Sequence, residues 1–166
     1  MMNEVNQAYA ETALKIFTDG GCSGNPGPGG WAYVIVMKTF QGEKIIARDK
    51  GAQANTTNNR MELNAVIAAL KLLKTMDGVP RRALVCTDSQ YVQKGITEWI
   101  QTWKKNTWRT SDKKPVKNQD LWMELDALRG ELSLDWEWVK CHAGNTYNEL
   151  CDRMTQEAIG AINNDY

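Results

Sequence analysis

Four acidic residues occupy positions from which their carboxylates could act together. Asp19 and Asp88 each follow a threonine at the end of an apolar run. A carboxylate at the end of a buried strand is costly unless it is paired or binds a metal ion. Glu62 begins an apolar helical stripe, so it faces the sheet rather than solvent. Asp152 lies beside the apolar face of the last expected helix.

Carboxylates that converge on a cleft repel one another and raise their pKa values unless cations neutralise them. Ligands that are all oxygens, without clustered His or Cys, suit Mg²⁺ bound through a few carboxylates, water and substrate phosphate. Two such ions, roughly 3.5–4 Å apart, form a clamp for in-line attack of water on a phosphodiester. The four acids therefore indicate a Mg²⁺-dependent phosphodiesterase.

Each acid also has an ordinary structural interpretation. Asp19 precedes Gly20 and is compatible with a turn aspartate. Asp88 could cap a helix that begins at Ser89. Glu62 could close a capping box with Asn59, which does not exclude a second role. For a lone helical aspartate such as Asp152, solvent exposure is the default.

The charge distribution is more informative than the total, which is zero. The segment from Lys94 to Lys117 carries seven basic and two acidic residues, so it is +5 and the other 142 residues sum to −5. Such a local cationic lobe on an acidic body suits a polyanionic partner. Its basic residues are Lys94, Lys104, Lys105, Arg109, Lys113, Lys114 and Lys117.

The four cysteines, Cys22, Cys86, Cys141 and Cys151, show no C-x-x-C spacing. A zinc site on Cys141, His142 and Cys151 stays open as an alternative, but reduced thiols in a cytoplasmic protein are the simpler interpretation. No apolar run reaches the roughly 18 residues of a membrane helix, and the polar N-terminus lacks a signal-peptide core. We therefore expect a cytoplasmic protein that does not enter a membrane.

At 166 residues the chain predicts a single domain over 14–162, after a disordered leader (1–13) and before a short tail (163–166). Its pattern predicts five strands over 13–19, 30–38, 44–52, 83–87 and 134–138. Helices are expected over 58–74, 89–95, 98–105, 118–128 and 146–162, the second and third separated by a break at Gly95. This order predicts an α/β fold with a mixed sheet, antiparallel in its first three strands and covered by helices on both faces.

The functional crevice of such sheets lies beyond the carboxyl ends of the strands, where Asp19 and Asp88 stand. The strand at 134–138 alternates strictly between acidic and apolar residues, which is typical of a half-exposed edge strand. Asp135 and Glu137 therefore belong on its outer face, and we exclude them from the site.

Five ordered motifs, at 18–27, 58–63, 87–92, 138–145 and 148–152, closely resemble type I ribonuclease H of the bacterial kind. The resemblance runs from about Leu14 to Ala158. It implies the ribonuclease H-like three-layer α/β/α fold. It also implies a monomeric, metal-dependent endonuclease that cuts the RNA strand of RNA–DNA hybrids and leaves 5′-phosphate and 3′-hydroxyl ends.

The resemblance assigns roles to five residues. Asp19 would bridge two Mg²⁺ ions, for which Mn²⁺ is a possible substitute. Asp152 would help to hold the ion that activates water, and Glu62 and Asp88 the ion on the leaving-group side. His142, on a Gly-rich loop, would carry a proton or assist product release.

Selectivity for RNA requires contacts to 2′-hydroxyl groups. The resemblance places eight residues along the RNA strand: Gly20, Gly21, Cys22, Asn25, Asn58, Asn59, Glu62 and Gln90. We expect the glycines of 20–30 to let the RNA backbone come close to the protein backbone. On the DNA side it places Thr57 and Asn118 at a phosphate, and Tyr91, Trp99 and Trp122 along the channel. Lys104 and Lys105, interleaved with Trp99, Trp103 and Trp108, would form a basic protrusion over about 94–117. We expect Trp103 also to serve partly as core.

Three positions depart from the family pattern: Asn55 stands where many relatives have a basic residue, Cys141 replaces a glycine and Arg153 replaces an acid. Two alternatives stay open. One is another nuclease or nucleotidyl transferase of the same fold, although proofreading exonucleases would show Asp-x-Glu where this chain has glycines after Asp19. The other is a non-enzymatic hybrid-binding module, which would need the basic lobe but not four acids.

Overall fold

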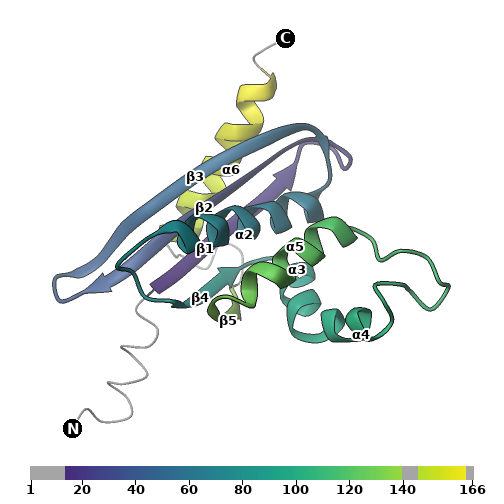
Figure 1. Cartoon of the computed structure of the whole chain (residues 1–166). Helices are drawn as coiled ribbons and strands as arrows, with labels where there is room; N and C mark the ends of the chain where they lie inside the picture. The colour runs from purple at the N-terminus through teal and green to yellow at the C-terminus, as the bar shows by residue number, and fades with distance from the viewer. Residues whose placement is uncertain (1–13, 140–145, 164–166) are drawn as a thin grey trace, which may run out of the picture.

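The structure is a computed structural model that describes residues 14–139 and 146–163 (Figure 1). Five strands are β1 (Leu14–Cys22), β2 (Gly27–Thr39), β3 (Gly42–Thr56), β4 (Arg82–Thr87) and β5 (Ser133–Trp138). The helices are α2 (Asn58–Thr75), α3 (Gln90–Lys94), the π-helical turn η1 (Gly95–Trp99), α4 (Ile100–Lys105), α5 (Gln119–Arg129) and α6 (Thr146–Asn163). Within this described part of the chain, no helix has the length and apolarity needed to cross a membrane.

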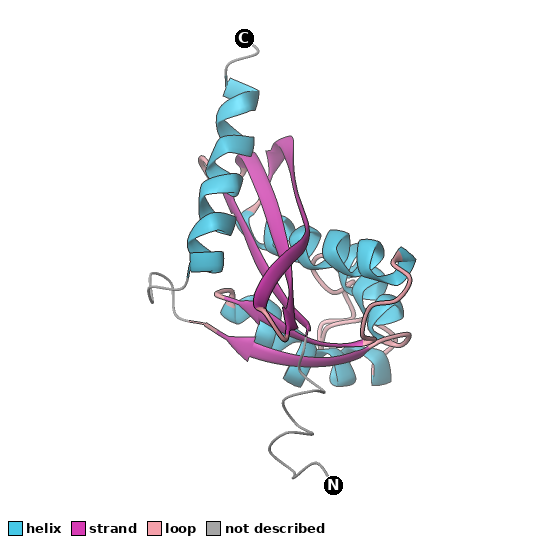
Figure 2. Ribbon diagram, turned by 90° about the vertical axis from the view of Figure 1, so that its left-hand side faces the viewer, coloured by secondary structure: helices cyan, strands magenta, loops and turns pink. Residues whose placement is uncertain are grey.

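The strands form one sheet in the order β3-β2-β1-β4-β5. β1, β2 and β3 pair antiparallel, whereas β4 lies parallel to both β1 and β5. Helix α6 covers one face of the sheet, and α2 and α5 lie on the other (Figure 2). The predicted three-layer fold with a mixed, five-stranded sheet is therefore confirmed.

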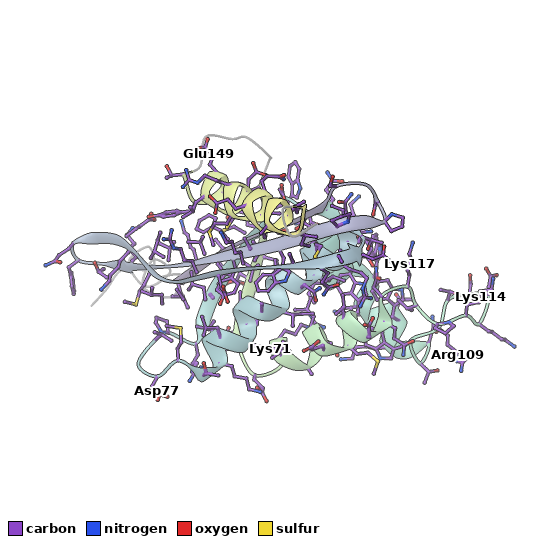
Figure 3. The ribbon with its side chains drawn as sticks, turned by 90° about the horizontal axis from the view of Figure 1, so that it is seen from above. Lys71, Asp77, Arg109, Lys114, Lys117 and Glu149 are labelled. Atoms are coloured by element: carbon purple, nitrogen blue, oxygen red, sulfur yellow. The ribbon has the colours of Figure 1, made fainter. Side chains whose placement is uncertain are left out.

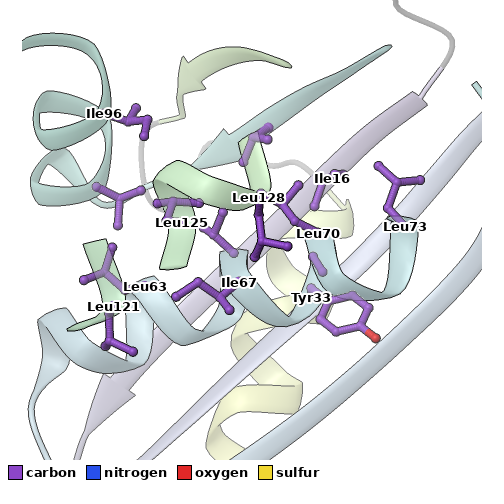
Figure 4. Packing of buried hydrophobic residues seen from close by; sticks show 14 of the residues in the cluster. Ile16, Tyr33, Leu63, Ile67, Leu70, Leu73, Ile96, Leu121, Leu125 and Leu128 are labelled. Atoms are coloured by element: carbon purple, nitrogen blue, oxygen red, sulfur yellow. The ribbon is translucent and has the colours of Figure 1, made fainter. Parts of the chain in front are cut away.

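Each face of the sheet has its own apolar core. On one face, α2 and α5 pack leucine and isoleucine side chains against β1, β2 and β4, with Ile16, Leu70 and Leu125 fully buried (Figure 4). On the other face, Cys151 and Met154 of α6 pack on Phe17, Ala32 and neighbouring strand residues. Because both faces of the sheet are covered, the part of β1 that carries Asp19 lies between the two helical layers.

Two predicted element boundaries were wrong because glycines do not act as breaks here. β1 continues past Asp19 to Cys22, and Gly21 pairs with Gly30 inside the ladder rather than in a loop. The helical segment also continues through Gly95, which has helical angles (φ −59°, ψ −47°). A Cβ at Gly95 would lie 2.0 Å from the ring of Trp122, so this glycine permits close packing and does not end a helix.

The edge position of β5 is confirmed, since it pairs only with β4 in the described sheet. Asp135 and Glu137 are exposed, and Asp135 accepts a hydrogen bond from Arg82 (Nη2 to Oδ2, 3.2 Å). Both acids therefore lie on the outer face of the strand, as their alternation with tryptophans predicts.

Candidate active site

Asp19 lies within strand β1, where its backbone pairs with Ala32 of β2. It is therefore not a turn aspartate. Burial raises its pKa to about 7, and the charges of Asp88 and Asp152 add to the rise, while the Thr155 side chain and the Gly20 backbone oppose it. The residue is a costly carboxylate held in a regular strand between two helices.

Glu62 reaches Asp19 because α2 begins very close to the sheet. A Cβ on Gly20 would lie 2.4 Å from the Met61 carbonyl carbon and 2.5 Å from the Glu62 backbone nitrogen. Only glycine at position 20 admits this approach. The helix is capped by Thr57, whose Oγ1 accepts a hydrogen bond from Arg60 N (3.3 Å). The alternative interpretation, a capping box formed by Asn59 and Glu62, is therefore wrong.

Asp88 follows β4 and is not a helix cap either. The cap of α3 is Ser89, whose Oγ accepts a hydrogen bond from Val92 N (3.1 Å). The Asp88 carbonyl accepts a hydrogen bond from Trp138 Nε1 (3.0 Å), and this fixes the backbone at the strand end. The cap of α3 is therefore Ser89, and Asp88 has no capping role there.

The side chains of Asp19, Glu62 and Asp88 converge, with one carboxylate oxygen of each within 4.8 Å of the others. Burial raises the pKa of Glu62 well above its ordinary value, and the charges of Asp19 and Asp88 raise it further. Its Oε2 is buried and has no hydrogen-bond partner among the described residues. An all-oxygen cluster with a buried, unsatisfied carboxylate oxygen fits a divalent cation of the Mg²⁺ class.

Asp152 is exposed on α6 and is not one of the three residues of this cluster. It lies close enough to contribute to the raised pKa of Asp19. One helical turn further along α6, Thr155 is buried beside Asp19, a neighbour that the sequence interpretation missed although the i+3 spacing from Asp152 could have indicated it. His142 and Cys141 lie outside the described residues, so their predicted roles and the alternative zinc site stay predictions.

These pKa shifts predict that metal-free protein loses stability as the pH rises. A carboxyl with a raised folded-state pKa binds more protons when folded than when unfolded, so folding becomes less favourable between the two pKa values. For Asp19 that window runs from 3.8 to about 7. Relative to Asp19→Asn, metal-free wild-type protein should lose on the order of 2–4 kcal/mol of unfolding free energy between pH 4 and pH 8.

Urea unfolding in the presence of a chelator, at several pH values, measures this difference. Adding Mg²⁺ at pH 8 should restore the lost stability, because an ion bound to the folded state neutralises the cluster. Equal pH dependence in wild-type and Asp19→Asn proteins would contradict the proposed environment of Asp19.

The turn between β1 and β2 is tied to the first turn of α2 by two asparagines. Asn25 Oδ1 accepts a hydrogen bond from Asn58 N (3.1 Å), and Asn58 Oδ1 accepts one from Cys22 N (2.8 Å). Asn25 and Asn58 are exposed, Cys22 and Asn59 are half-buried, and Gln90 is exposed at the start of α3. Two of the predicted RNA-side residues, Asn25 and Asn58, thus fix the β1–β2 turn against the start of α2, and the contacts of this group with RNA stay a prediction.

The glycines near Asp19 serve chiefly to let helices approach the sheet. A Cβ on Gly29 would meet Thr56, Cys22 and Met61, and one on Gly30 would meet the backbone of Thr155 at 2.8 Å. Packing therefore requires glycine at positions 29 and 30, and access for an RNA backbone stays a prediction. Gly21 has open space beside it, its nearest neighbour being Asn58 Oδ1 at 4.0 Å.

The predicted DNA-side residues form a second, connected group. Tyr91 Oη accepts hydrogen bonds from Asn118 Nδ2 (3.0 Å) and from Trp122 Nε1 (2.9 Å). The ring of Tyr91 lies against those of Trp99 (centroids 5.8 Å apart) and Trp122 (5.4 Å). Trp122 is fully buried, so within this group it holds its neighbours in position and is not itself accessible.

The cationic lobe extends from the body of the protein beyond α4 (Figures 1 and 3). Lys105 and Arg109 are exposed, and Lys104 pairs with Asp126 of α5 (Nζ to Oδ2, 3.1 Å). Trp103 is half-buried and packs against Trp99, Trp108 and Trp122, which agrees with its expected role in the core. The cationic side chains of the lobe thus lie next to a cluster of packed tryptophans.

Sequence comparison shows that this chain is similar to proteins named ribonuclease H. A sequence model of the RNase H family matches residues 11–160. Ribonuclease H of Treponema denticola is 54% identical over 155 residues, covering 87% of this chain and 96% of that protein. Ribonuclease HI of Vibrio cholerae is 52% identical over 145 residues, covering 87% of each chain.

Solved structures show the same fold. LC9-RNase H1, described as a type 1 RNase H with the type 2 active-site motif, superposes with a TM-score of 0.79 at 29% identity, covering 89% of this chain and 72% of that one. LC11-RNase H1, solved in complex with an RNA/DNA hybrid, has a TM-score of 0.68 and covers 90% of this chain and 98% of its own. At 23% identity, the second comparison shows the fold alone.

Proposed function

The chain belongs to the ribonuclease H family, and we propose that it hydrolyses the RNA strand of RNA–DNA hybrids at the cluster of Asp19, Glu62 and Asp88. The observation that carries this proposal is the convergence of three carboxylates from β1, α2 and the end of β4 within 4.8 Å. A protein that only bound hybrids would have no use for so costly an arrangement, so the cluster argues against a non-enzymatic binding module.

We propose that Asp19, Glu62, Asp88 and Asp152 would hold two Mg²⁺ ions, for which Mn²⁺ would be a substitute. Bound ions of this class make water a nucleophile and stabilise charge on the leaving oxygen of an in-line displacement, which gives 5′-phosphate and 3′-hydroxyl ends. The raised pKa values of Asp19 and Glu62 support the proposal, because cations at this position would neutralise negative charges that the fold holds close together at a cost. His142 is proposed to carry a proton near the scissile phosphate.

The surrounding residues support binding of a hybrid across the end of the sheet. We propose that Gly20, Cys22, Asn25, Asn58, Asn59 and Gln90 contact the RNA strand, and that Thr57, Tyr91, Trp99 and Asn118 contact the DNA strand. Trp122 is buried, so its share is to hold Tyr91 in place. Action as a monomer in the cytoplasm, and the division into a leader (1–13), a domain (14–162) and a tail (163–166), stay predictions from the sequence.

A substrate comparison tests the function. A hybrid labelled at the 5′ end of its RNA strand should be cut internally with Mg²⁺ and remain intact with chelator, while a DNA duplex of the same sequence is not cut. Because the 2′-hydroxyl distinguishes the two strands, selectivity for RNA is the expected result. Equal cleavage of both duplexes would instead indicate another nuclease of the same fold.

The basic lobe, proposed to bind the hybrid, gives a separate prediction. Replacing Lys104, Lys105 and Arg109 by alanine should raise KM about tenfold or more at moderate salt and flatten its salt dependence, with kcat little changed. A matched control removes the three exposed cations Lys44, Arg48 and Lys50 of β3, which lie outside the lobe. A fall in kcat with unchanged KM in the lobe variant, or an equal rise in KM in the control, would show that the lobe is not a specific binding surface.

A further inference from the structure

Arg60 connects the carboxylate-bearing helix α2 to the group of residues on the proposed DNA side. Its guanidinium binds Asp120 through two hydrogen bonds, Nη1 to Oδ1 (3.0 Å) and Nη2 to Oδ2 (2.8 Å). Nη1 also donates to Asn118 Oδ1 at 3.3 Å. This arginine lies two residues before Glu62 on the same helix.

The contact with Arg60 fixes which way the Asn118 amide points. Asn118 has left-handed backbone angles (φ 60°, ψ 29°), and its side chain makes no capping bond to α5. Because a guanidinium can only donate, the atom that faces Arg60 must be the amide oxygen. The NH₂ group is then turned to Tyr91 Oη, with one N–H in that bond and the second available.

The hydrogen-bond partners of the Tyr91 hydroxyl fix its donor direction in the same way. Its oxygen accepts two hydrogen bonds, from Asn118 Nδ2 and Trp122 Nε1, so its own hydrogen can only be donated elsewhere. Within residues 14–139 and 146–163 that hydrogen has no acceptor. Thr57 Oγ1 likewise accepts from the Arg60 backbone N–H, which leaves its hydroxyl hydrogen as a donor.

The internal hydrogen bonds of these three side chains therefore occupy their acceptor atoms and leave donor groups unbonded. Asn118, Tyr91 and Thr57 each keep one N–H or O–H group for an outside partner. A set of donors without a competing carboxylate acceptor suits an anionic phosphate oxygen. Asp120, at the start of α5, is held by Arg60, which lowers the pKa of that carboxyl and balances its charge.

We infer that Arg60 is a positioning residue: it orients the Asn118 amide so that Asn118 and Tyr91 present donors to a phosphodiester oxygen of the strand that is not cut. This inference rests on the proposed function, because it assigns the binding of that strand within the same site. Arg60 itself touches neither the carboxylate cluster nor, in this account, the phosphate.

The test is a double-mutant cycle on hybrid cleavage. Arg60→Met should raise KM about tenfold with kcat within about twofold, the loss expected when a donor to a charged group is misoriented. Asn118→Ala should raise KM similarly, and the double variant should be no worse than Asn118→Ala alone, because Arg60 acts through Asn118. The dissociation constant of each variant for a fluorescent hybrid, measured in the presence of chelator, should rise by the same factor as its KM.

A matched control separates this role from simple bridging of two helices. Lys71 pairs with Glu124 and thereby also joins α2 to α5, remote from Asn118. Lys71→Met should leave KM unchanged even where its loss of thermal stability matches that of Arg60→Met. If circular dichroism shows that Arg60→Met is unfolded, Arg60→Lys replaces it in the cycle, since lysine keeps the charge but lacks the fork that holds both partners.

Two results would overturn the inference while leaving the proposed function intact: unchanged KM in Arg60→Met, or a KM rise that persists in full in the Asn118→Ala background. Failure of the wild-type protein to cleave any hybrid would instead overturn the proposed function. The two failures are therefore distinguishable in one set of assays.

Discussion

Replacing Asp19 by asparagine is expected to lower Mg²⁺-dependent cleavage of an RNA–DNA hybrid by at least about 1,000-fold. Asp19 interacts with both Asp88 and Asp152, whose charges add to the rise in its pKa. Asparagine keeps the shape of the side chain but removes the negative charge that a cation requires. Single-turnover cleavage with saturating enzyme measures the loss independently of substrate binding.

Hybrid binding should survive in the same variant, because the proposed binding surfaces lie on the β1–β2 turn, α3 and the basic lobe. Asp135→Asn is the matched control, since Asp135 is an exposed aspartate of the same sheet at its outer edge. It should cleave at the wild-type rate. Unchanged cleavage by Asp19→Asn would exclude the proposed mechanism, and loss of binding would show that the substitution damages the surface rather than the chemistry.

Gly20→Ala is expected to destabilise the protein by about 3 kcal/mol and to impair cleavage as well. The added Cβ would lie 2.4–2.6 Å from backbone atoms of Met61 and Glu62, so the first turns of α2 must move away from β1. Backbone cannot yield as the end of a flexible side chain does, and the displacement carries Glu62 away from Asp19. Urea unfolding and isothermal titration with Mg²⁺ measure the two effects.

Gly21→Ala is the control for this prediction. The two glycines are adjacent in β1, but a Cβ at position 21 has nothing nearer than Asn58 Oδ1 at 4.0 Å. We expect a change in unfolding free energy of less than about 1 kcal/mol and nearly normal metal affinity. Similar losses in both variants would mean that the strand tolerates no alanine in this segment, and the close approach of α2 would not be the reason.

The sequence predicted the layers and the acids well because both rest on local patterns. Glu62 heads a periodic apolar stripe, and that stripe places it toward the sheet whichever strand lies opposite. The structure confirms the fold and brings Asp19, Glu62 and Asp88 together.

The errors concern glycine, whose role depends on what lies opposite in space. The sequence pattern predicts a loop at Gly20 and a helix break at Gly95, whereas each glycine provides room for a neighbour: the backbone of α2 at Gly20 and the ring of Trp122 at Gly95. No local pattern carries this information, because the neighbours come from residues 61 and 122. For the same reason the link from Arg60 to Asn118, which spans 58 residues, could not be predicted from either motif alone.

The most direct test of the account is the position of a bound ion. Crystals of the protein soaked in saturating MnCl₂ and measured at the manganese absorption edge should show an anomalous difference peak between the carboxylates of Asp19, Glu62 and Asp88. That result would place a divalent cation where the buried Oε2 of Glu62 lacks a partner among the described residues. Manganese bound elsewhere on the protein, with no peak at this cluster, would contradict the proposal that these three acids form the catalytic metal site.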